Sequence, residues 1–509
     1  MRDLLFHLQP TAPTSLQAQI REKIVTAIVG GQLPEGDRMP SSRALARDLK
    51  VSRNTVTLAY QSLVDDGFLA GRERSGYYVN RATLESAQPT PRRIAVTVGG
   101  SKVDWASRLA IVPGAQRNVA KPDNWAKYPY PFIYGQVDVA LFPIAEWRDC
   151  ARQALGRRWL EDWAADHHAA DDAMLVEQIR TRLLPRRGVM AGDNEILITV
   201  GAQHALYLLS ALLITAQTTV AVEDPGYPDV RNIFALATNR LVPIPVDGDG
   251  LITDERLDGC DLVYASPSHQ APTTVTMTEA RRLALLEKAR AQDFVIIEDD
   301  YEFETNYVCA PLPALKSLDR DGRVLYVGSL SKTVFPGLRL GYLVGPPELI
   351  KEARALRRLM VRHPPNNSQR TAALFLQLGH HDAMILKLRR TYGERWRIIG
   401  EAIERHLPML TRMPSHGGSS VWLQGLPGLD ADALAVSALA EGVVIEAGSV
   451  FFANGSARRN CFRLGFSSID ASRIEDGIKV LAKLIQGRET RPGANKLAGT
   501  SRRGSLALP

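Results

Sequence analysis

From Tyr128 onward, long helical stretches alternate with short runs of β-branched and apolar residues. Five of these runs have the length of a buried strand: residues 195–200, 219–223, 262–265, 294–298 and 323–327. Strands separated by helices usually pair in parallel, with the helices packed on the faces of the sheet. The alternation therefore predicts a large α/β unit with a mainly parallel sheet.

The composition bounds the class of protein. The chain has 509 residues, of which 45% are hydrophobic and 23% charged, so it can bury more than one core. The best apolar candidate, residues 206–214, is too short to span a bilayer, and the first residues lack the apolar core of a signal peptide. The four cysteines are too scattered for a zinc knuckle or a disulfide framework. We expect a soluble cytoplasmic protein with reduced thiols and no membrane partner.

The N-terminal residues have a different, denser helical pattern. An apolar residue recurs every fourth position from Leu16 to Ile28, which predicts a first helix that ends at residues 30–31. A second helix opens after Pro40 with Ser41 or Ser42 as its cap, and a third follows the tight turn at residues 50–52. This is the spacing of a helix-turn-helix, whose second helix enters the major groove of DNA.

The string GQLPEGDRMPSSRALARDLKVSRNTVTLAYQSLVDDGFLAGRERSGYYV, residues 31–79, resembles the GntR-type winged helix, with a two-stranded wing after Phe68. The resemblance implies a DNA-binding domain over residues 12–80 with double-stranded operator DNA as its partner. The residues it assigns to phosphates or bases are Arg43, Ser52, Arg53, Asn54, Thr57, Ser75 and Gly76. Arg53 is the best candidate to read a guanine, because its fork matches the O6/N7 pair. The alternative is that these arginines only form a solvated helix face.

Net charge does not settle whether the chain binds DNA. Of the formal charge of +7, an excess of four cations lies in residues 488–509, whereas residues 1–80 hold ten Lys and Arg against eight Asp and Glu. We interpret residues 488–509 as a disordered basic tail. Residues 81–120 are rich in Pro, Arg, Ser and Gly, which is typical of a linker, and residues 121–487 form the large unit.

Residues 328–342 read GSLSKTVFPGLRLGY. A lysine after a small, hydroxyl-rich turn can form a Schiff base with pyridoxal 5'-phosphate, and Ser329, Ser331 and Arg339 are placed to hold the phosphate. Lys332 is therefore the expected catalytic lysine and pyridoxal phosphate the expected cofactor. Upstream, FVIIEDDY at residues 294–301 predicts a strand that delivers carboxylates to its C-terminal end, where open α/β sheets bind ligands.

Two further segments fit the same cofactor. The turn before Ala202 and Gln203 leads from a strand into an apolar helix, so backbone N–H groups there can face a phosphate. Tyr227, in the string EDPGYP, can stack on the pyridine ring. Both segments have simpler explanations in turn and packing chemistry, so they corroborate the cofactor without deciding it.

Taken in order, these segments resemble the MocR/GabR family from residue 14 to about 485: a GntR-type winged helix fused to a fold-type I aminotransferase-like domain. The resemblance implies that Asp299 holds the pyridine nitrogen and that Tyr301 hydrogen-bonds the ring hydroxyl. It also implies that Arg463, in CFRLGFS at residues 461–467, clamps an effector carboxylate. A head-to-tail homodimer is a further implication.

The chain departs from the aminotransferase pattern in two places. PSHQAPTT at residues 267–274 stands where related enzymes carry Asn-Pro-Thr-Gly, so Ala271 cannot supply the asparagine contact and His269 is expected to replace it. Residues 162–172, DWAADHHAADD, lack the motif that sends a tyrosine across the dimer interface. Their His and Asp residues could suggest a metal, but we interpret the segment as a solvated helix and expect no metal site.

The expected function is a regulator in which an amino-acid-like amine forms an external aldimine with the cofactor and biases DNA binding, without physiological turnover. The alternative is an aminotransferase with an accessory DNA-binding module, which would use the same residues and is compatible with weak transamination. A plain GntR-type repressor with an inert domain conflicts with a cofactor site built from five segments.

Overall fold

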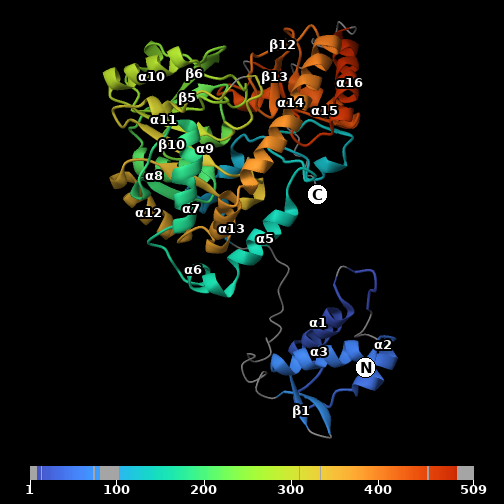
Figure 1. Cartoon of the computed structure of the whole chain (residues 1–509). Coiled ribbons are helices and arrows are strands. Elements are labelled where there is room, and N and C mark those ends of the chain that lie inside the picture. Colours follow the sequence, from blue (N-terminus) through green and yellow to red (C-terminus); the bar gives the residue numbers. More distant parts are fainter. Residues whose placement is uncertain are drawn as a thin grey trace. The chain divides into compact units, whose positions relative to one another are not determined.

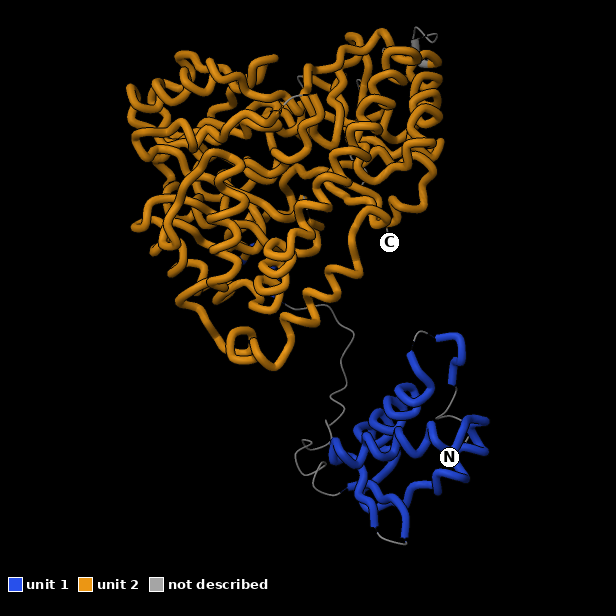
Figure 2. The backbone as a smooth tube through the Cα atoms, viewed as in Figure 1, with its two compact units in different colours: residues 1–108 blue, residues 109–509 orange. Residues whose placement is uncertain are grey.

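The computed structural model describes residues 8–12, 14–72, 75–80, 103–308, 310–332, 334–455 and 458–489. The chain divides into two units, residues 1–108 and 109–509 (Figure 2). We name them after the functions that the sequence predicts for them, the DNA-binding unit and the effector unit. Part of the expected linker (residues 81–102), Cys309 and the expected tail from residue 490 onward lie outside the described residues.

The DNA-binding unit is a three-helix bundle with a β-wing (Figure 1). Its elements are α1 (Leu16–Val29), α2 (Ser42–Leu49), α3 (Arg53–Asp65), β1 (Leu69–Arg72) and β2 (Gly76–Val79). The stripe of α1 buries Ile20, Ile24 and Ile28 against Tyr60 of α3. β1 and β2 pair antiparallel.

Local chemistry fixes the ends of α2 and α3. The Ser41 hydroxyl accepts from the N–H of Ala44 at 3.2 Å, so Ser41 caps α2. Lys50 adopts a left-handed conformation with φ 54° and ends α2, and the Ser52 hydroxyl then caps α3 by accepting from Thr55 N at 3.1 Å. Capping satisfies N–H groups that have no partner inside the helix. The predicted helix-turn-helix and wing are confirmed.

The effector unit is built on an eight-stranded sheet with the order β4-β11-β10-β9-β8-β5-β6-β7. The strands are β4 (Ile196–Thr199), β5 (Val220–Asp224), β6 (Leu241–Asp247), β7 (Gly250–Leu251), β8 (Leu262–Ala265), β9 (Val295–Asp300), β10 (Val324–Ser329) and β11 (Gly341–Val344). β11 runs antiparallel to its neighbours β4 and β10, and β7 runs antiparallel to β6, whereas the other neighbouring strands pair in parallel. The predicted, mainly parallel α/β sheet is confirmed, and β6, β7 and β11 add to the five runs that the sequence predicts.

Helices cover both faces of this sheet (Figure 1). Successive residues of a strand point to opposite faces, so on β9 Ile297 packs in the core that includes α8 residues, and Ile296 in the core that includes α10 residues. The helices of the effector unit are α5 (Ile144–Ala154), α6 (Leu160–Ala164), α7 (Ala173–Gln178), α8 (Ala202–Leu213), α9 (Pro228–Ala235), α10 (Glu279–Gln292), α11 (Leu315–Leu318), α12 (Pro347–Val361), α13 (Asn366–Gln377), α14 (His380–His406), α15 (Ala431–Ala440) and α16 (Ala471–Glu489).

A second, antiparallel sheet was not predicted as a sheet from the sequence. Its order is β12 (Thr411–Arg412), β13 (Ser420–Gln424), β16 (Cys461–Gly465) and β15 (Glu446–Ala447). In addition, β3 (Tyr130–Pro131) pairs in parallel with β14 (Val443–Val444). The register places Arg463 of β16 directly opposite Glu446 of β15.

The interpretation of residues 162–172 as a solvated helix is wrong. α6 ends at Ala164 and α7 begins at Ala173, and the residues between them form turns. Asp171 is buried, and its carboxylate pairs with Arg354 at 2.6 Å and Arg357 at 2.5 Å, both on α12. Buried carboxylates need such partners, and these lie too far along the chain for the local pattern to reveal them.

Three observations concern the other expectations from composition. Among the residues that the structure describes, no helix is both long and apolar enough to cross a membrane. Within the same residues, no cluster of three or more His, Cys, Asp and Glu side chains could hold a metal ion. Cys150, Cys260 and Cys461 are buried free thiols.

Candidate functional site

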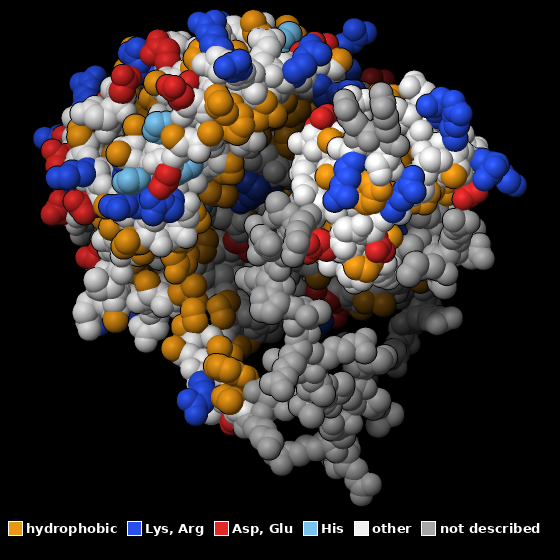
Figure 3. All heavy atoms as spheres, turned by 90° about the horizontal axis from the view of Figure 1, so that it is seen from below, with side chains coloured by type: hydrophobic (Ala, Val, Ile, Leu, Met, Phe, Trp, Pro, Cys, Tyr) orange, Lys and Arg blue, Asp and Glu red, His pale blue; other side chains and the backbone are white. Residues whose placement is uncertain are grey.

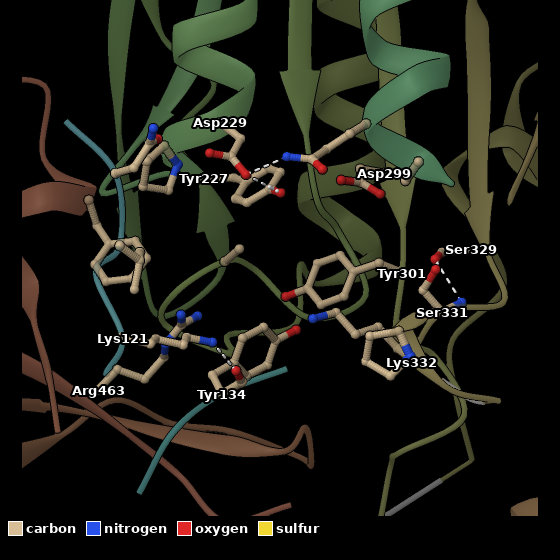
Figure 4. Close-up of a pocket in the computed structure, with 18 of the residues that line it drawn as sticks. Lys121, Tyr134, Tyr227, Asp229, Asp299, Tyr301, Ser329, Ser331, Lys332 and Arg463 are labelled. Carbon is tan, nitrogen blue, oxygen red and sulfur yellow. Dashed lines mark hydrogen bonds between the residues drawn. The ribbon is translucent and has the colours of Figure 1, made fainter. Parts of the chain in front are cut away.

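A cavity of about 300 Å³ lies in the effector unit, at the carboxyl ends of the parallel strands (Figure 4). It collects side chains from the starts of α8 and α9, from the ends of β9 and β10, and from β16. The lining residues are Asn118, Val119, Lys121, Tyr134, Ala202, Gln203, Tyr227, Pro228, Asp229, Ala271, Asp299, Tyr301, Ser329, Ser331, Lys332, Pro336, Arg339, Phe451 and Arg463. Every residue that the sequence assigns to the cofactor or effector is among them except His269.

Lys332 projects its amine into this cavity (Figure 4). Its Nζ lies 4.1 Å from the centre of the Tyr134 ring. Gly135 leaves room for it, because a Cβ atom there would lie 2.7 Å from Nζ. Burial, reinforced by Lys121 and opposed by Glu302, lowers the pKa of Lys332 to about 8. At neutral pH a larger share of this amine is therefore neutral and nucleophilic than is usual for a lysine.

An anion cradle lies beside the lysine. Helix α8 begins at Ala202, immediately after Gly201, whose φ of +80° favours glycine. A Cβ atom at Gly201 would lie 2.8 Å from Nη2 of Arg339, so glycine also lets the guanidinium approach the helix N-terminus. The buried Ser331 hydroxyl has no hydrogen-bond partner in the described protein, and the Ser331 N–H donates to Ser329 Oγ at 3.2 Å. A helix N-terminus, hydroxyls and a guanidinium together suit a phosphate.

The two adjacent acids at the end of β9 have different environments. Oδ2 of Asp299 accepts a hydrogen bond from the Tyr264 hydroxyl at 2.8 Å, while its Oδ1 is buried without a hydrogen-bond partner among the described residues. Burial raises the pKa of Asp299 to about 7. A buried carboxylate that lines a cavity and lacks a cation is suited to a positively charged or N–H-bearing ligand atom.

Asp300 points away from the cavity. It pairs with the buried Arg187 guanidinium at 2.6 Å and accepts from the Tyr326 hydroxyl at 2.8 Å. Burial alone would raise the pKa of Asp300, but Arg187 and the hydrogen bonds around the carboxylate outweigh burial and lower it. Asp300 is therefore part of a buried ion pair rather than of the cavity wall.

Tyr227 is oriented by a residue that the sequence reasoning missed. The carboxylate of Asp229 accepts hydrogen bonds from the Tyr227 hydroxyl at 2.8 Å and from the amide of Gln203 (Figure 4). These bonds hold the tyrosine ring against the cavity. The only sequence signal for Asp229 is its place two residues after Tyr227.

The structure does not bring the imidazole of His269 into the cavity. The ring is buried elsewhere, and only the His269 carbonyl takes part, accepting from the Tyr301 hydroxyl at 2.6 Å. The cavity wall at this position is formed by Ala271. A contact from the His269 ring to a ligand in the cavity is therefore not supported by this placement.

The other end of the cavity is basic. Arg463 donates from Nε to Oε2 of Glu446 at 2.7 Å, and its guanidinium carbon lies 4.1 Å from the Tyr134 ring centre and 4.6 Å from that of Phe451. Lys121 Nζ lies 3.2 Å from Oε1 of the same Glu446. Lys121, Tyr134 and Glu446 were missed, because Lys121 lies at the edge of the segment read as a linker and the others belong to no motif.

In the DNA-binding unit the candidate contacts are mostly exposed. Arg53 and Asn54 open α3, and Arg43 is exposed on α2. The Ser52 hydroxyl is engaged in the helix cap, and the Thr57 hydroxyl donates to the carbonyl of Arg53 at 2.9 Å. The head of α3 therefore presents the Arg53 and Asn54 side chains to solvent, as a recognition helix requires.

Two arginines that the sequence reasoning did not name, Arg72 of β1 and Arg38 before α2, lie at the wing. The Ser75 and Tyr78 hydroxyls lie 2.7 Å apart, and Gly76 has a φ of +107° at the turn. The guanidinium of Arg72 lies over the Tyr78 ring at 4.6 Å. A Cβ atom at Gly76 would lie 3.9 Å from Nε of Arg38, so this second arginine is also at the wing tip.

Comparison with known protein families agrees with both units. The family of bacterial regulatory proteins of the gntR type matches residues 16–79, and aminotransferase class I and II matches residues 173–481. The kynurenine aminotransferase of Pyrococcus horikoshii, solved with PMP, superimposes with a TM-score of 0.70 at 27% identity, covering 76% of this chain and 99% of that one. LysN, the alpha-aminoadipate aminotransferase of Thermus thermophilus, was solved with N-(5'-phosphopyridoxyl)-L-leucine. It superimposes with a TM-score of 0.69 at 27% identity, covering 76% of this chain and 100% of that one.

Two regulators resemble the chain over nearly its full length. The HTH-type transcriptional regulator TauR of Rhodobacter capsulatus is 44% identical over 483 residues, which cover 94% of this chain and 99% of that protein. The probable rhizopine catabolism regulatory protein MocR of Rhizobium meliloti is 30% identical over 476 residues, which cover 93% of this chain and 94% of that protein. With a gntR-type domain followed by an aminotransferase class I and II domain, the chain belongs to the MocR family of DNA-binding transcriptional regulators.

Proposed function

We propose that this regulator holds pyridoxal phosphate through Lys332 and changes its affinity for operator DNA when an amino-acid-like amine enters the cavity. One observation carries the proposal. The Lys332 amine, the unpaired Oδ1 of Asp299 and the unpaired Ser331 hydroxyl all line one cavity. Unpaired buried polar atoms are costly unless a ligand pairs them, and pyridoxal phosphate has an aldehyde, a pyridine nitrogen and a phosphate that match these three groups.

The remaining residues around the cofactor have separate roles. Ser329, Arg339 and the N-terminus of α8 would hold the phosphate, and Asp299 would keep the pyridine nitrogen protonated. Tyr227, oriented by Asp229, would cover the ring, and Tyr301 would bind the ring hydroxyl. When bound, the cofactor supplies an aldehyde that condenses with an amine with loss of water, and a pyridinium ring that withdraws electrons.

The effector would be a short amino acid. Lys332 Nζ and the guanidinium of Arg463 each lie 4.1 Å from the centre of the Tyr134 ring, so they are at most about 8 Å apart. An amine that replaces Lys332 at the cofactor would therefore place a nearby carboxylate at Arg463, whose fork suits such a group. The residues on the two sides of Tyr134 would thus bind the two ends of one small zwitterion.

The gntR-type domain implies DNA binding, and we propose which of its elements contact the DNA. The head of α3, with Arg53 and Asn54, would enter the major groove, and the wing tip around Ser75 and Gly76 would contact the backbone. The exposed Arg53 and Asn54 side chains and the turn at Gly76 support this docking.

We also propose a homodimer, so that two winged helices meet two operator half-sites. On the larger of the two units, hydrophobic side chains gather in a band on the side drawn in Figure 3. Exposed large apolar side chains of the effector unit include Ile144, Leu155 and Leu160, which are 57%, 50% and 45% exposed. Exposed apolar surface of this kind is typical of protein interfaces.

The proposal is tested by loading the full chain with pyridoxal phosphate, reducing it with borohydride and mapping the modified peptide. We expect a pyridoxyl group on Lys332, a change in the cofactor absorbance when an amino acid is added, and no accumulation of keto acid. Sustained keto-acid formation would instead favour an aminotransferase with an accessory DNA-binding domain. A reduced adduct on any other lysine would refute the site.

A further inference from the structure

Residues 116–121, which we call the strap, pass along the cavity in the effector unit. The amide of Gln116 donates to the carbonyl of Asn232 on α9 at 3.1 Å. Arg117 donates from Nη2 to the carbonyls of Phe452 and Ala453 at 3.0 and 2.9 Å, just after the short helix Gly448–Phe451. The strap is thereby attached to two elements that are far apart in the sequence, and it forms part of the cavity wall.

Lys121 ends the strap with its amine at the basic end of the cavity. Its Nζ lies 3.2 Å from Oε1 of Glu446 and donates to the carbonyl of Tyr134. The Lys121 side chain is 26% exposed, whereas that of Glu446 is 1% exposed. Lys121 is therefore a partly exposed cation beside a buried carboxylate, and it lines the cavity.

At the basic end of the cavity, a single carboxylate forms ion pairs with two cations. Glu446 pairs with Lys121 through Oε1 and with Arg463 through Oε2. Burial would raise the pKa of Glu446, but Arg463 and Lys121 outweigh burial and lower it, so the carboxylate is ionised at neutral pH. The three side chains together carry one net positive charge. Since an uncompensated charge in a cavity is costly, this end favours a ligand with a single negative charge.

We propose that Lys121 is a specificity-determining residue that binds the acidic group of the effector together with Arg463, so that the cavity selects amino acids over plain amines. The inference deepens the proposed function and rests on it. A plain amine would leave the positive charge unbalanced, whereas the acidic group of an amino acid would pair with both cations. Sites that hydrogen-bond a polar group reject analogues lacking that group, because their own polar atoms then stay unpaired.

Lys121 lies close in sequence to the connection between the two units, so a ligand that binds Lys121 contacts this part of the chain. The strap follows the segment that connects the DNA-binding unit to the effector unit. A ligand that pairs with Lys121 therefore binds directly to a part of the effector unit that is close in sequence to the connection. We expect such a ligand to slow amide hydrogen exchange in the strap.

The test compares Lys121→Met with Lys121→Arg and with Lys127→Met, an exposed lysine six residues further along the same segment. Each protein is loaded with pyridoxal phosphate and titrated with L-alanine, 3-aminopropanoate and 4-aminobutanoate, and with ethylamine, propylamine and butylamine as probes without an acidic group. Cofactor absorbance gives the half-saturating concentration. Hydrogen exchange of peptides covering residues 116–121 is measured with and without the best amino acid.

In the wild type we expect amino acids to saturate at lower concentration than the plain amines. Lys121→Met should raise the half-saturating concentration of the amino acids about tenfold or more, the size of a lost hydrogen bond to a charged group, and leave the plain amines unchanged. Lys121→Arg should restore most of the preference, Lys127→Met should match the wild type, and strap protection should disappear in Lys121→Met.

The outcomes separate this inference from the proposed function. A wild-type protein that forms no reducible adduct overturns the proposed function, and the inference with it. A wild type that forms the adduct but does not prefer amino acids to plain amines overturns the inference alone. The inference also fails if Lys121→Met weakens both classes equally, since that indicates a purely structural role, or if it matches Lys127→Met.

Discussion

The two units hold their candidate functional residues in opposite ways. In the DNA-binding unit, Arg53 and Asn54 are exposed side chains at the head of one helix, oriented by a cap within the same few residues. In the effector unit, Lys332 and Asp299 are inside a cavity whose walls come from distant segments. Oδ1 of Asp299 and the Ser331 hydroxyl have no hydrogen-bond partner among the described residues.

This difference predicts two kinds of response to mutation. A surface side chain that reads DNA contributes one of many contacts, so its loss should cause a graded change in affinity. A buried group that forms a covalent bond or half of an ion pair has no substitute. Its removal should therefore abolish nearly all of the property that depends on it. The following predictions test this contrast, in order of decreasing expected effect.

Replacing Lys332 with alanine should abolish the covalent cofactor adduct, because no other lysine amine lies beside the anion cradle in the described structure. Lys127→Met, which removes an exposed lysine that does not line the cavity, serves as the control and should retain the adduct. Borohydride reduction followed by mass spectrometry measures the result. An adduct that survives in Lys332→Ala would place the reactive amine elsewhere and break the contrast between the units.

Asp300→Asn and Asp299→Asn should affect different properties. Asp300→Asn leaves the buried Arg187 guanidinium without its counter-ion, so we expect a loss of about 3–5 kcal/mol in the free energy of unfolding. Asp299→Asn removes a carboxylate whose pKa burial raises to about 7, so the stability of the cofactor-free protein should hardly change. Cofactor affinity should fall by roughly 10- to 100-fold, the size of one charge-assisted hydrogen bond.

Urea unfolding of the cofactor-free proteins and spectroscopic titration with pyridoxal phosphate distinguish the two variants. If Asp299→Asn loses stability and Asp300→Asn loses only cofactor affinity, the roles assigned to the adjacent acids are reversed.

Arg53→Ala should cost on the order of 1–3 kcal/mol of discrimination between operator and scrambled DNA, the value of one bidentate contact to guanine. The matched control is Arg320→Ala, which removes an exposed arginine of the effector unit and changes the net charge equally. A chain that ends at Gly487 should lose affinity for both DNAs alike, because its missing cations can only neutralise phosphate. Binding titrations at several salt concentrations measure all three. A truncated chain that loses operator preference would contradict the proposed docking.

The smallest expected effect is the pH dependence of cofactor capture. Burial lowers the pKa of Lys332 to about 8, so the reactive neutral amine increases as pH rises through 8 and is nearly complete at 9. The initial rate of adduct formation should therefore rise about tenfold from pH 7 to pH 9 and then level off. Stopped-flow absorbance measures it. A rate that keeps rising to pH 10 would indicate an amine with an ordinary pKa, as on an exposed surface.

The sequence predicts well where neighbours along the chain determine the outcome. The stripe from Leu16 to Ile28, the caps at Ser41 and Ser52 and the five β-branched runs all appear as elements within a residue or two of the expected limits. The end of the cavity around Lys332 and Asp299 belongs to this class, because these residues lie in short motifs at the ends of parallel strands, which meet at one edge of the sheet.

The basic end of the cavity, around Arg463, could not be predicted in the same way. Lys121 and Glu446 meet across more than three hundred residues, and neither belongs to a recognisable motif. The ion pairs of Asp171 could not be predicted for the same reason, because its partners Arg354 and Arg357 lie far along the chain, on α12. His269 is the opposite case, since its position in the sequence suggests a ligand contact, but Ala271 and not His269 lines the cavity.

The central claim is that occupancy of the effector unit controls the DNA-binding unit, and operator affinity measured with and without an amino acid tests it most directly. The full chain, loaded with pyridoxal phosphate, is titrated with a DNA fragment that it has selected from a random pool, in the presence and absence of the amino acid that saturates the cavity best. We predict a change in affinity of about 5- to 150-fold, the usual range of such coupling, and no change in Lys332→Ala. An equal change in Lys332→Ala, or none in a wild type whose cofactor absorbance responds to the amino acid, would contradict the account.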